Sequence, residues 1–260
     1  MSIPVKLTLI GGPTVLIECA GLRILTDPTF DLPGEYSLGA VTLKKISQPA
    51  VSADAIGPID AVLLSHDQHA DNLDTSGRAF LTDVPKVITT VSGAKRLQQN
   101  AQGLNPWEFI SLQTRDGHTL TITAAPARHG PFLIERITGD VIGFVISLDG
   151  QTENTLYITG DTVWFSGTAE VSHRFHVSTV LAFAGAAKTR GPFHLTMDVN
   201  DVLETANAFS QAAIIPVHCE GWAHFSQNAE DLIQSFKTLQ LESRLRPIQP
   251  GESLSVAIGK

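Results

Sequence analysis

Short apolar runs rich in β-branched residues dominate the hydrophobic pattern of the chain. Such runs predict strands when turn-forming residues bound them, as Gly11, Gly12 and Pro13 do near the start. We predict strands over residues 5–10, 14–18, 22–26, 60–65, 86–90, 119–127, 141–148, 155–159, 178–183 and 213–217. The first three follow one another so closely that they indicate a hairpin or meander.

Helical periodicity is clearest in the second half of the chain. Apolar residues recur at helical spacing after Thr196, a residue that can cap a helix, and again after Ser226. A further helix is predicted over residues 93–102. The periodic positions are Val199, Val202, Leu203, Ala206 and Phe209, then Leu232, Ile233, Phe236 and Leu239. Because no linker or low-complexity stretch separates these elements, we predict a single domain over residues 1–260.

Side chains that can bind a metal follow four of the predicted strands. They are His66, His129, Asp161 and His218. Strand ends are rigid and lie on one rim of a sheet, so ligands that are distant in sequence can converge there. Imidazole and carboxylate together favour Zn, Mn or Fe over Ca or Mg. The pattern therefore predicts a metal site at one edge of a sheet.

The segment SHDQHADNLD (residues 65–74) strengthens this prediction. It brings two histidines and three aspartates together within nine residues, directly after an apolar strand. Its histidines, His66 and His69, are three positions apart. This density of metal-competent groups predicts a metal-binding loop.

Composition and charge narrow the class of partner. The 260 residues are 43% hydrophobic, which is enough for a substantial core. The formal net charge is −8 and the longest basic run is Lys44-Lys45, so we expect no nucleic-acid partner. Two cysteines, Cys19 and Cys219, are too few for a disulfide framework.

The sequence also bears on localisation. The start, MSIPVKLTLIGG, lacks the basic and long apolar regions of a signal peptide. Nor does an uninterrupted apolar stretch of about 18 residues follow. We therefore expect a cytoplasmic protein that acts on a small molecule, with no membrane partner. A homo-oligomer is compatible with the sequence.

Five motifs together resemble the metallo-β-lactamase-fold hydrolases, in the branch that includes the L-ascorbate-6-phosphate lactonase type. In chain order they are LIGGPTVLIECAGLRILTDPTF (9–30), SHDQHADNLD (65–74), PARHGP (126–131), YITGDTVW (157–164) and IPVHCEGWAHF (215–225). The resemblance implies a four-layer αββα sandwich. Two mixed β-sheets would pack face to face with helices outside, and a metal site would lie on one edge.

The ligands of this family carry over unevenly. Its signature is HxHxDH. The first two histidines of the signature bind a first metal ion together with a histidine later in the chain, and His129 matches that later histidine. The second metal ion is bound by the signature aspartate, which Asp71 matches, and by a final histidine, which His218 matches. A further aspartate of the family bridges the two ions, and Asp161 matches it. His69 matches the histidine two positions before Asp71.

Two departures from the signature leave alternatives open. Counting back from Asp71 with the spacing of the signature places Asp67 at the first ligand position. Counting forward from the end of the strand places His66 at that position instead, and the loop then contains one extra residue near Gln68. We favour His66, because the strand fixes it rigidly and a loop can accommodate one residue as a bulge. The second departure is Asn72, which replaces the last histidine.

The second site is therefore expected to be weaker, since an amide oxygen is a poorer zinc ligand than imidazole. Asn72 or His194 is a candidate to complete it. His224 and Trp222 are candidates for contact with substrate or for support of the site. The resemblance makes Asp27 a residue that orients a ligand histidine.

The resemblance implies hydrolysis by metal-activated water. One or two ions are expected, with Zn²⁺ first and Mn²⁺ or Fe as alternatives, and Asp71 would orient the water or accept its proton. The substrate would be a small lactone, amide or ester, or a phosphodiester. The alternative is a metal-binding protein on the same fold with little hydrolase activity, acting as a redox or binding module, and Asn72 keeps it open.

Loops form the pocket walls in this family. The candidates are residues 30–50 and 163–195. Their apolar side chains would either give a partly apolar pocket or simply cover the edge of the sandwich; they are Phe30, Leu32, Tyr36, Trp164, Phe165 and Phe193.

Overall fold

A seven-stranded sheet forms one half of the molecule. The computed structural model describes residues 2–38, 41–98, 100–189 and 191–260. The strand order is β15-β1-β2-β3-β6-β7-β8. Pairing is antiparallel from β15 to β3 and parallel from β3 to β8. The bounds are β1 Ile3–Gly11, β2 Thr14–Cys19, β3 Leu22–Thr26, β6 Ala61–Leu63, β7 Val87–Thr90, β8 Ala101–Leu104 and β15 Ser253–Ile258.

A six-stranded sheet forms the other half, in the order β14-β13-β12-β11-β10-β9. Here β12, β13 and β14 are parallel, and β11 is antiparallel to both β10 and β12. Strands β10, β12 and β14 therefore end at the same edge of the sheet. The bounds are β9 Phe109–Gln113, β10 Thr119–Pro126, β11 Ile142–Leu148, β12 Glu153–Ile158, β13 His176–Phe183 and β14 Ala213–Val217.

The two sheets pack face to face around the main core. Along β1, Val5, Leu7 and Leu9 are buried while Pro4, Lys6 and Thr8 are more exposed, the alternation expected of a strand with one face inward, and the last residues of the strand are buried on both faces. These side chains meet Ile122 and Phe144 of the second sheet. The pattern of strands and their burial thus agree.

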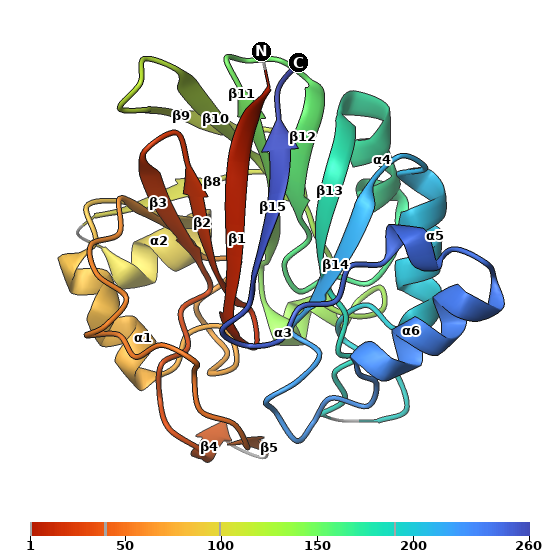
Figure 1. Ribbon diagram of the computed structural model, residues 1–260. Coiled ribbons are helices and arrows are strands. Elements are labelled where there is room, and N and C mark those ends of the chain that lie inside the picture. The colour runs from red at the N-terminus through yellow and green to blue at the C-terminus, as the bar shows by residue number, and fades with distance from the viewer. Residues whose placement is uncertain (1, 39–40, 99, 190) are drawn as a thin grey trace.

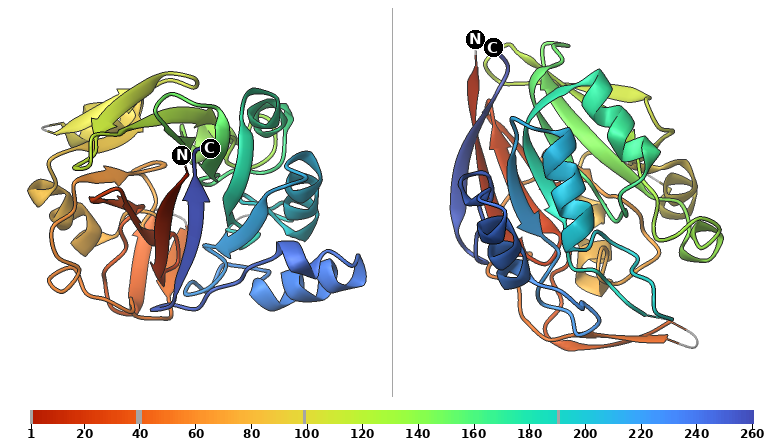
Figure 2. Two further views of the ribbon diagram at one scale, coloured as in Figure 1. Left: turned by 45° about the horizontal axis from the view of Figure 1, so that its top comes forward. Right: turned by 90° about the vertical axis from the view of Figure 1, so that its right-hand side faces the viewer.

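Helices cover the outer faces (Figures 1 and 2). Helices α1 and α2 lie on the first sheet, and α4, α5 and α6 on the second. The bounds are α1 Thr75–Phe80, α2 Val91–Leu97, α3 Glu135–Thr138, α4 Ser166–Arg174, α5 Val199–Ala208 and α6 Ala229–Thr238, with 3₁₀ turns at Leu81–Asp83 and Glu242–Arg244. The predicted αββα sandwich is confirmed. Within the described parts of the chain, none of these helices is long and apolar enough to cross a membrane.

The predicted cap at Thr196 was wrong, and Ser226 does not cap the following helix either. The side chain of Asp198 caps α5 by accepting from the Asp201 amide, and Asn228 caps α6. Thr196 instead accepts a hydrogen bond from the Ala187 amide, and Ser226 donates to the Ala186 carbonyl. Tertiary hydrogen bonds occupy both hydroxyls, and the amides are capped by residues closer to each helix.

Two predicted loops contain regular structure. Residues 30–50 include a hairpin of β4 (Gly34–Leu38) and β5 (Val41–Lys45), and 163–195 include α4 as well as β13, which covers the strand predicted over 178–183. The helix predicted over 93–102 begins earlier, at Val91, and ends at Leu97. Its last predicted residues belong to β8, which pairs with β7.

Candidate metal centre

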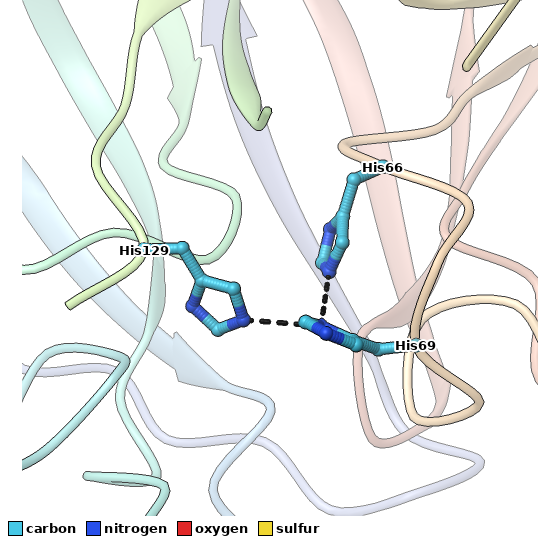
Figure 3. A group of neighbouring side chains, drawn as sticks. All are labelled: His66, His69 and His129. Carbon is cyan, nitrogen blue, oxygen red and sulfur yellow. Dashed lines mark hydrogen bonds between the residues drawn. The ribbon is translucent and has the colours of Figure 1, made fainter. Parts of the chain in front are cut away.

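Three histidines converge where β6 and β10 end. His66 Nε2 lies 2.8 Å from His69 Nδ1, and His129 Nε2 lies 3.1 Å from that same nitrogen. Figure 3 shows the three rings directed toward one another, two from the loop after β6 and one from the segment after β10. Burial lowers the pKa of His66 well below its usual value and that of His69 to about 4. Both imidazoles are therefore neutral near pH 7, the form that binds metals.

Asp71, Asp161 and His218 form a second buried cluster beside the first. His218 Nε2 lies 3.4 Å from Asp161 Oδ1 and 3.6 Å from Asp71 Oδ2. The other carboxylate oxygen of Asp161, Oδ2, lies 3.6 Å from His129 Nε2. Asp161 thus stands between the two clusters, in the position expected of a bridging ligand.

The electrostatics of the second cluster suit a cation. Burial alone would raise the pKa of Asp161 and Asp71, but His218 beside them holds both pKa values below the ordinary range. Burial opposes the charge on His218, while Asp161 and Asp71 raise its pKa to about 10. Positive charge is therefore stabilised among these carboxylates.

Buried polar atoms without a hydrogen-bond partner test whether these residues fit a bound metal ion. Asp71 Oδ1 and both ring nitrogens of His218 are buried and have no hydrogen-bond partner among the described residues. Unpaired buried polar atoms are costly, and a bound cation would satisfy a carboxylate oxygen and an imidazole nitrogen together. In each cluster the potential ligand atoms lie within 4.8 Å of one another. The residues fit one ion in each cluster.

Asp67 points away from both clusters. Its carboxylate, 3% exposed, pairs with Arg96 through contacts of 2.5 and 2.9 Å, and its carbonyl accepts from Arg78. The extra loop residue therefore leaves His66, rather than Asp67, beside His69. Arg96 and Arg78 were not anticipated, because nothing near Asp67 in the sequence identifies its partner.

Asp27 acts on the histidine cluster through an intermediary. Its Oδ1 accepts from the Ser65 amide at 2.9 Å and from the Ser65 hydroxyl at 2.7 Å. The hydroxyl in turn lies 3.0 Å from His66 Nδ1. The predicted contact with a ligand histidine is thus made by Ser65, which sequence reasoning missed although it directly precedes His66.

The ring of His129 is fixed by another unpredicted group. Its Nδ1 lies 2.9 Å from the carbonyl oxygen of Leu195, which can only accept, so Nδ1 carries the proton. The Nε2 lone pair is then free to face the cluster. A backbone carbonyl leaves no signal in a sequence.

His194 lies in neither cluster, so its suggested place at the second site was wrong. Its Nε2 contacts Asp201 at 3.1 Å and its Nδ1 faces Asp198 at 3.5 Å. Both partners lie at the start of α5, and hydrogen bonding to Asp201 raises the pKa of His194. The carboxylates of α5 thus determine the direction of this ring.

His224 contacts the site directly, whereas Trp222 supports it. His224 Nε2 lies 2.9 Å from Asp71 Oδ2, and its ring packs against Trp222. Trp222 is buried against Tyr36 and lies under the ammonium group of Lys45. It is therefore a packing residue between the hairpin and the loop after β14.

A cavity of about 310 Å³ opens onto the clusters. Its polar side carries His69, Asp71, His129 and His224. Its other described walls come from the β4–β5 hairpin, the α3 region and the segment before α5: Val41, Leu43, Gln68, Ile137, Thr138, Gly139, Ala187, Thr189 and Leu195. The aromatic side chains predicted for the pocket do not line this cavity; Phe30, for example, is buried against Phe80.

Comparison with known proteins agrees with this geometry. The sequence model described as "Beta-lactamase superfamily domain" matches residues 22–219. The chain is 25% identical to the UPF0173 protein YddR of Bacillus subtilis, with 95% of this chain and 98% of the relative covered. It is 26% identical to a UPF0173 metal-dependent hydrolase of Carboxydothermus hydrogenoformans, again covering 95% and 98%.

A similar solved structure is the isothiocyanate hydrolase from Delia radicum gut bacteria. It superposes with a TM-score of 0.80 at 25% sequence identity, covering 96% of this chain and 98% of that one. None of these three relatives is named as an ascorbate phosphate lactonase. That branch of the predicted family therefore stays a prediction.

Proposed function

This chain belongs to the β-lactamase superfamily and is a metal-dependent hydrolase, and on that premise we propose that it hydrolyses small uncharged electrophiles with apolar substituents. The walls of the 310 Å³ cavity carry the proposal. Val41, Leu43, Ile137 and Leu195 face the histidine and aspartate side, and the described lining includes neither Lys nor Arg.

The proposed ligands divide between the two clusters. His66, His69 and His129 would hold one ion, Asp71 and His218 a second, and Asp161 would reach both. Zinc suits these nitrogen and oxygen donors best, with manganese or iron as alternatives. A divalent ion held here would lower the pKa of a bound water toward neutrality and polarise the bond under attack.

Asp71 is the candidate general base for the attacking water. Its Oδ1 is buried without a partner among the described residues, while its Oδ2 is held by His224 at 2.9 Å. We propose that the carboxylate of Asp71 orients the attacking water, accepts its proton and returns it to the leaving group.

The charge of the cavity selects the substrate class. A phosphodiester or a β-lactam carries an anionic group that needs a cationic partner once it leaves water, and beyond the proposed metal ions the described walls of the cavity offer none. The described lining offers apolar side chains and neutral amides or hydroxyls instead. Lactones, neutral esters, amides and isothiocyanates fit these walls. The similar isothiocyanate hydrolase makes that last class the first to test.

A substrate panel tests the proposal. Protein loaded with Zn²⁺, Mn²⁺ or Fe²⁺ would be assayed on an aryl-alkyl isothiocyanate, a neutral lactone, a nitrophenyl ester, bis(nitrophenyl) phosphate and a chromogenic cephalosporin. We expect kcat/KM to be at least about 100-fold higher on a neutral substrate than on either anion. Preference for an anion would reject the substrate class. Absence of turnover with full metal content would favour a metal-binding module.

A wall variant sharpens this test. Ile137 is 73% exposed and lines the cavity, so it can be changed without disturbing the core. Ile137→Arg places a cation at the rim and should shift the ratio of kcat/KM values toward the phosphodiester. Ile137→Gln, of similar polarity but uncharged, is the matched control and should leave that ratio nearly unchanged.

A further inference from the structure

Asn72 holds a carboxylate at the second cluster instead of offering a metal ligand. Its amino group donates to Asp161 Oδ1 at 3.3 Å and to Ser65 Oγ at 3.4 Å. The reversed amide would place its oxygen against a carboxylate oxygen, so the observed orientation is the favourable one. The amide oxygen, Oδ1, is buried without a hydrogen-bond partner among the described residues. Asp71, Asp161 and His218 form the second cluster, and Asp161 also lies 3.6 Å from His129 of the first.

His224 is the imidazole next to this incomplete set. Its side chain is only 9% exposed, and its Nε2 lies 2.9 Å from Asp71 Oδ2. The histidine nitrogens of the first cluster approach one another at 2.8 and 3.1 Å, which is the same range. These are hydrogen-bond distances, and the ligand atoms of a tetrahedral zinc ion at about 2.05 Å lie only slightly further apart, at about 3.3 Å, so a small outward movement of these atoms would admit an ion.

The ring of His224 is held in place by its surroundings. It packs against Phe225 and Trp222, with ring centroids 4.7 and 6.0 Å away. The carbonyl of His224 accepts from the Lys188 amide at 2.9 Å, which ties its loop to the neighbouring segment. A preorganised imidazole loses little conformational entropy when it binds a metal.

We propose that His224 supplies to the second ion the imidazole that Asn72 cannot supply. The second ion would then be bound by Asp71, Asp161, His218 and His224. The competing explanation is a plain hydrogen bond from His224 to Asp71. Asp71 Oδ1 and both ring nitrogens of His218 are buried and unpaired among the described residues, so an ion is expected in this cluster under either explanation, and the metal stoichiometry of a His224 variant distinguishes the two. This inference rests on the proposed metal-dependent function.

Metal stoichiometry tests the assignment independently of turnover. Equilibrium dialysis against Zn²⁺ with elemental analysis should give two equivalents for the unmodified protein. His224→Ala should retain the first equivalent and bind the second at least about 100-fold more weakly. His173→Ala, which removes an exposed histidine of α4 that belongs to none of the metal-competent clusters, is the matched control and should keep both. Circular dichroism would verify that each variant is folded.

A compensating change strengthens the test. Asn72→His in the His224→Ala background returns an imidazole to the cluster and should restore the second equivalent. In the unmodified protein, the ¹⁵N resonance of the His224 ring should shift as that equivalent is added, a measurement that does not depend on a variant's folding.

The outcomes separate this inference from the proposed function. Each of three results would overturn the assignment. Folded His224→Ala could bind two zinc equivalents tightly, the ¹⁵N resonance of the His224 ring could stay unchanged as the second equivalent is added, or the unmodified protein could bind a single equivalent. If His224→Ala loses the second equivalent but the unmodified protein hydrolyses nothing in the panel, His224 stands as a ligand and the hydrolase proposal fails.

Discussion

Arg96 holds the carboxylate of Asp67 on the side of the loop away from the histidines. Arg96 Nη2 lies 2.5 Å from Oδ1 and its Nε lies 2.9 Å from Oδ2, a two-pronged contact to a carboxylate that is 3% exposed. Such geometry fixes direction as well as distance. The pair therefore stabilises the conformation in which His66 faces His69.

The first prediction separates the roles of Asp67 and His66. Asp67→Asn should keep nearly full metal content but lower the free energy of unfolding by about 1–3 kcal/mol, because a charged hydrogen-bonded pair is lost. His66→Ala should abolish tight binding of one metal equivalent. Urea unfolding and elemental analysis measure the two effects. If Asp67→Asn empties the site and His66→Ala spares it, Asp67 is the ligand.

The second prediction concerns the first cluster. His129 contacts both His69 and the bridging Asp161, so His129→Ala should remove most bound metal and all hydrolysis. His173→Ala, on the partly exposed surface of α4, is the control and should change neither. Full metal stoichiometry in His129→Ala would show that the first site is assigned wrongly.

The third prediction concerns a buried ion pair beneath the hairpin. Lys45 Nζ lies 2.9 Å from Asp74 Oδ2, with exposures of 4% and 0%, and Asp74 also caps α1. Lys45→Met would leave the Asp74 charge buried and unpaired, so unfolding should become easier by about 3–5 kcal/mol. Lys44→Met, at a side chain 60% exposed, should cost less than about 1 kcal/mol. Equal effects in thermal unfolding would contradict this role for the pair.

The fourth prediction is a pH dependence centred on His194. Hydrogen bonding to Asp201 raises the pKa of His194 above 6.5, and Asp198 adds to the effect. A raised folded-state pKa gives stability that is fully present below the unfolded value and is lost as pH rises through the folded value. The unmodified protein should therefore have a higher free energy of unfolding than His194→Ala at pH 5.5, and the difference should disappear at pH 9. Because the ring is partly exposed, the difference at pH 5.5 should stay below about 1 kcal/mol. The metal content of His194→Ala should equal that of the unmodified protein. A loss of metal in this variant would show that His194 contributes to the metal site.

Much of the fold follows from local pattern. The alternation along β1 and the helical spacing around Val202 and Phe236 predict buried faces, and the structure buries them. The β4–β5 hairpin escaped prediction because its strands pair mainly with each other at the margin of the molecule, so their sequence carries little apolar pattern. Cap residues escaped because a hydroxyl such as that of Thr196 can serve either a helix or a tertiary contact.

The sequence by itself determined which side chains gather at the candidate site. His66, His129, Asp161 and His218 each follow a short strand, β6 of the first sheet and β10, β12 and β14 of the second, and the ends of these strands lie at one edge of the sandwich. Only the tertiary structure decided the direction of the remaining groups. Asp67 turns to Arg96, 29 residues away, and His224 reaches Asp71 across 153 residues. Hydrophobic periodicity reports which face of an element is buried, but the orientation of a polar side chain depends on the partner that folding brings beside it.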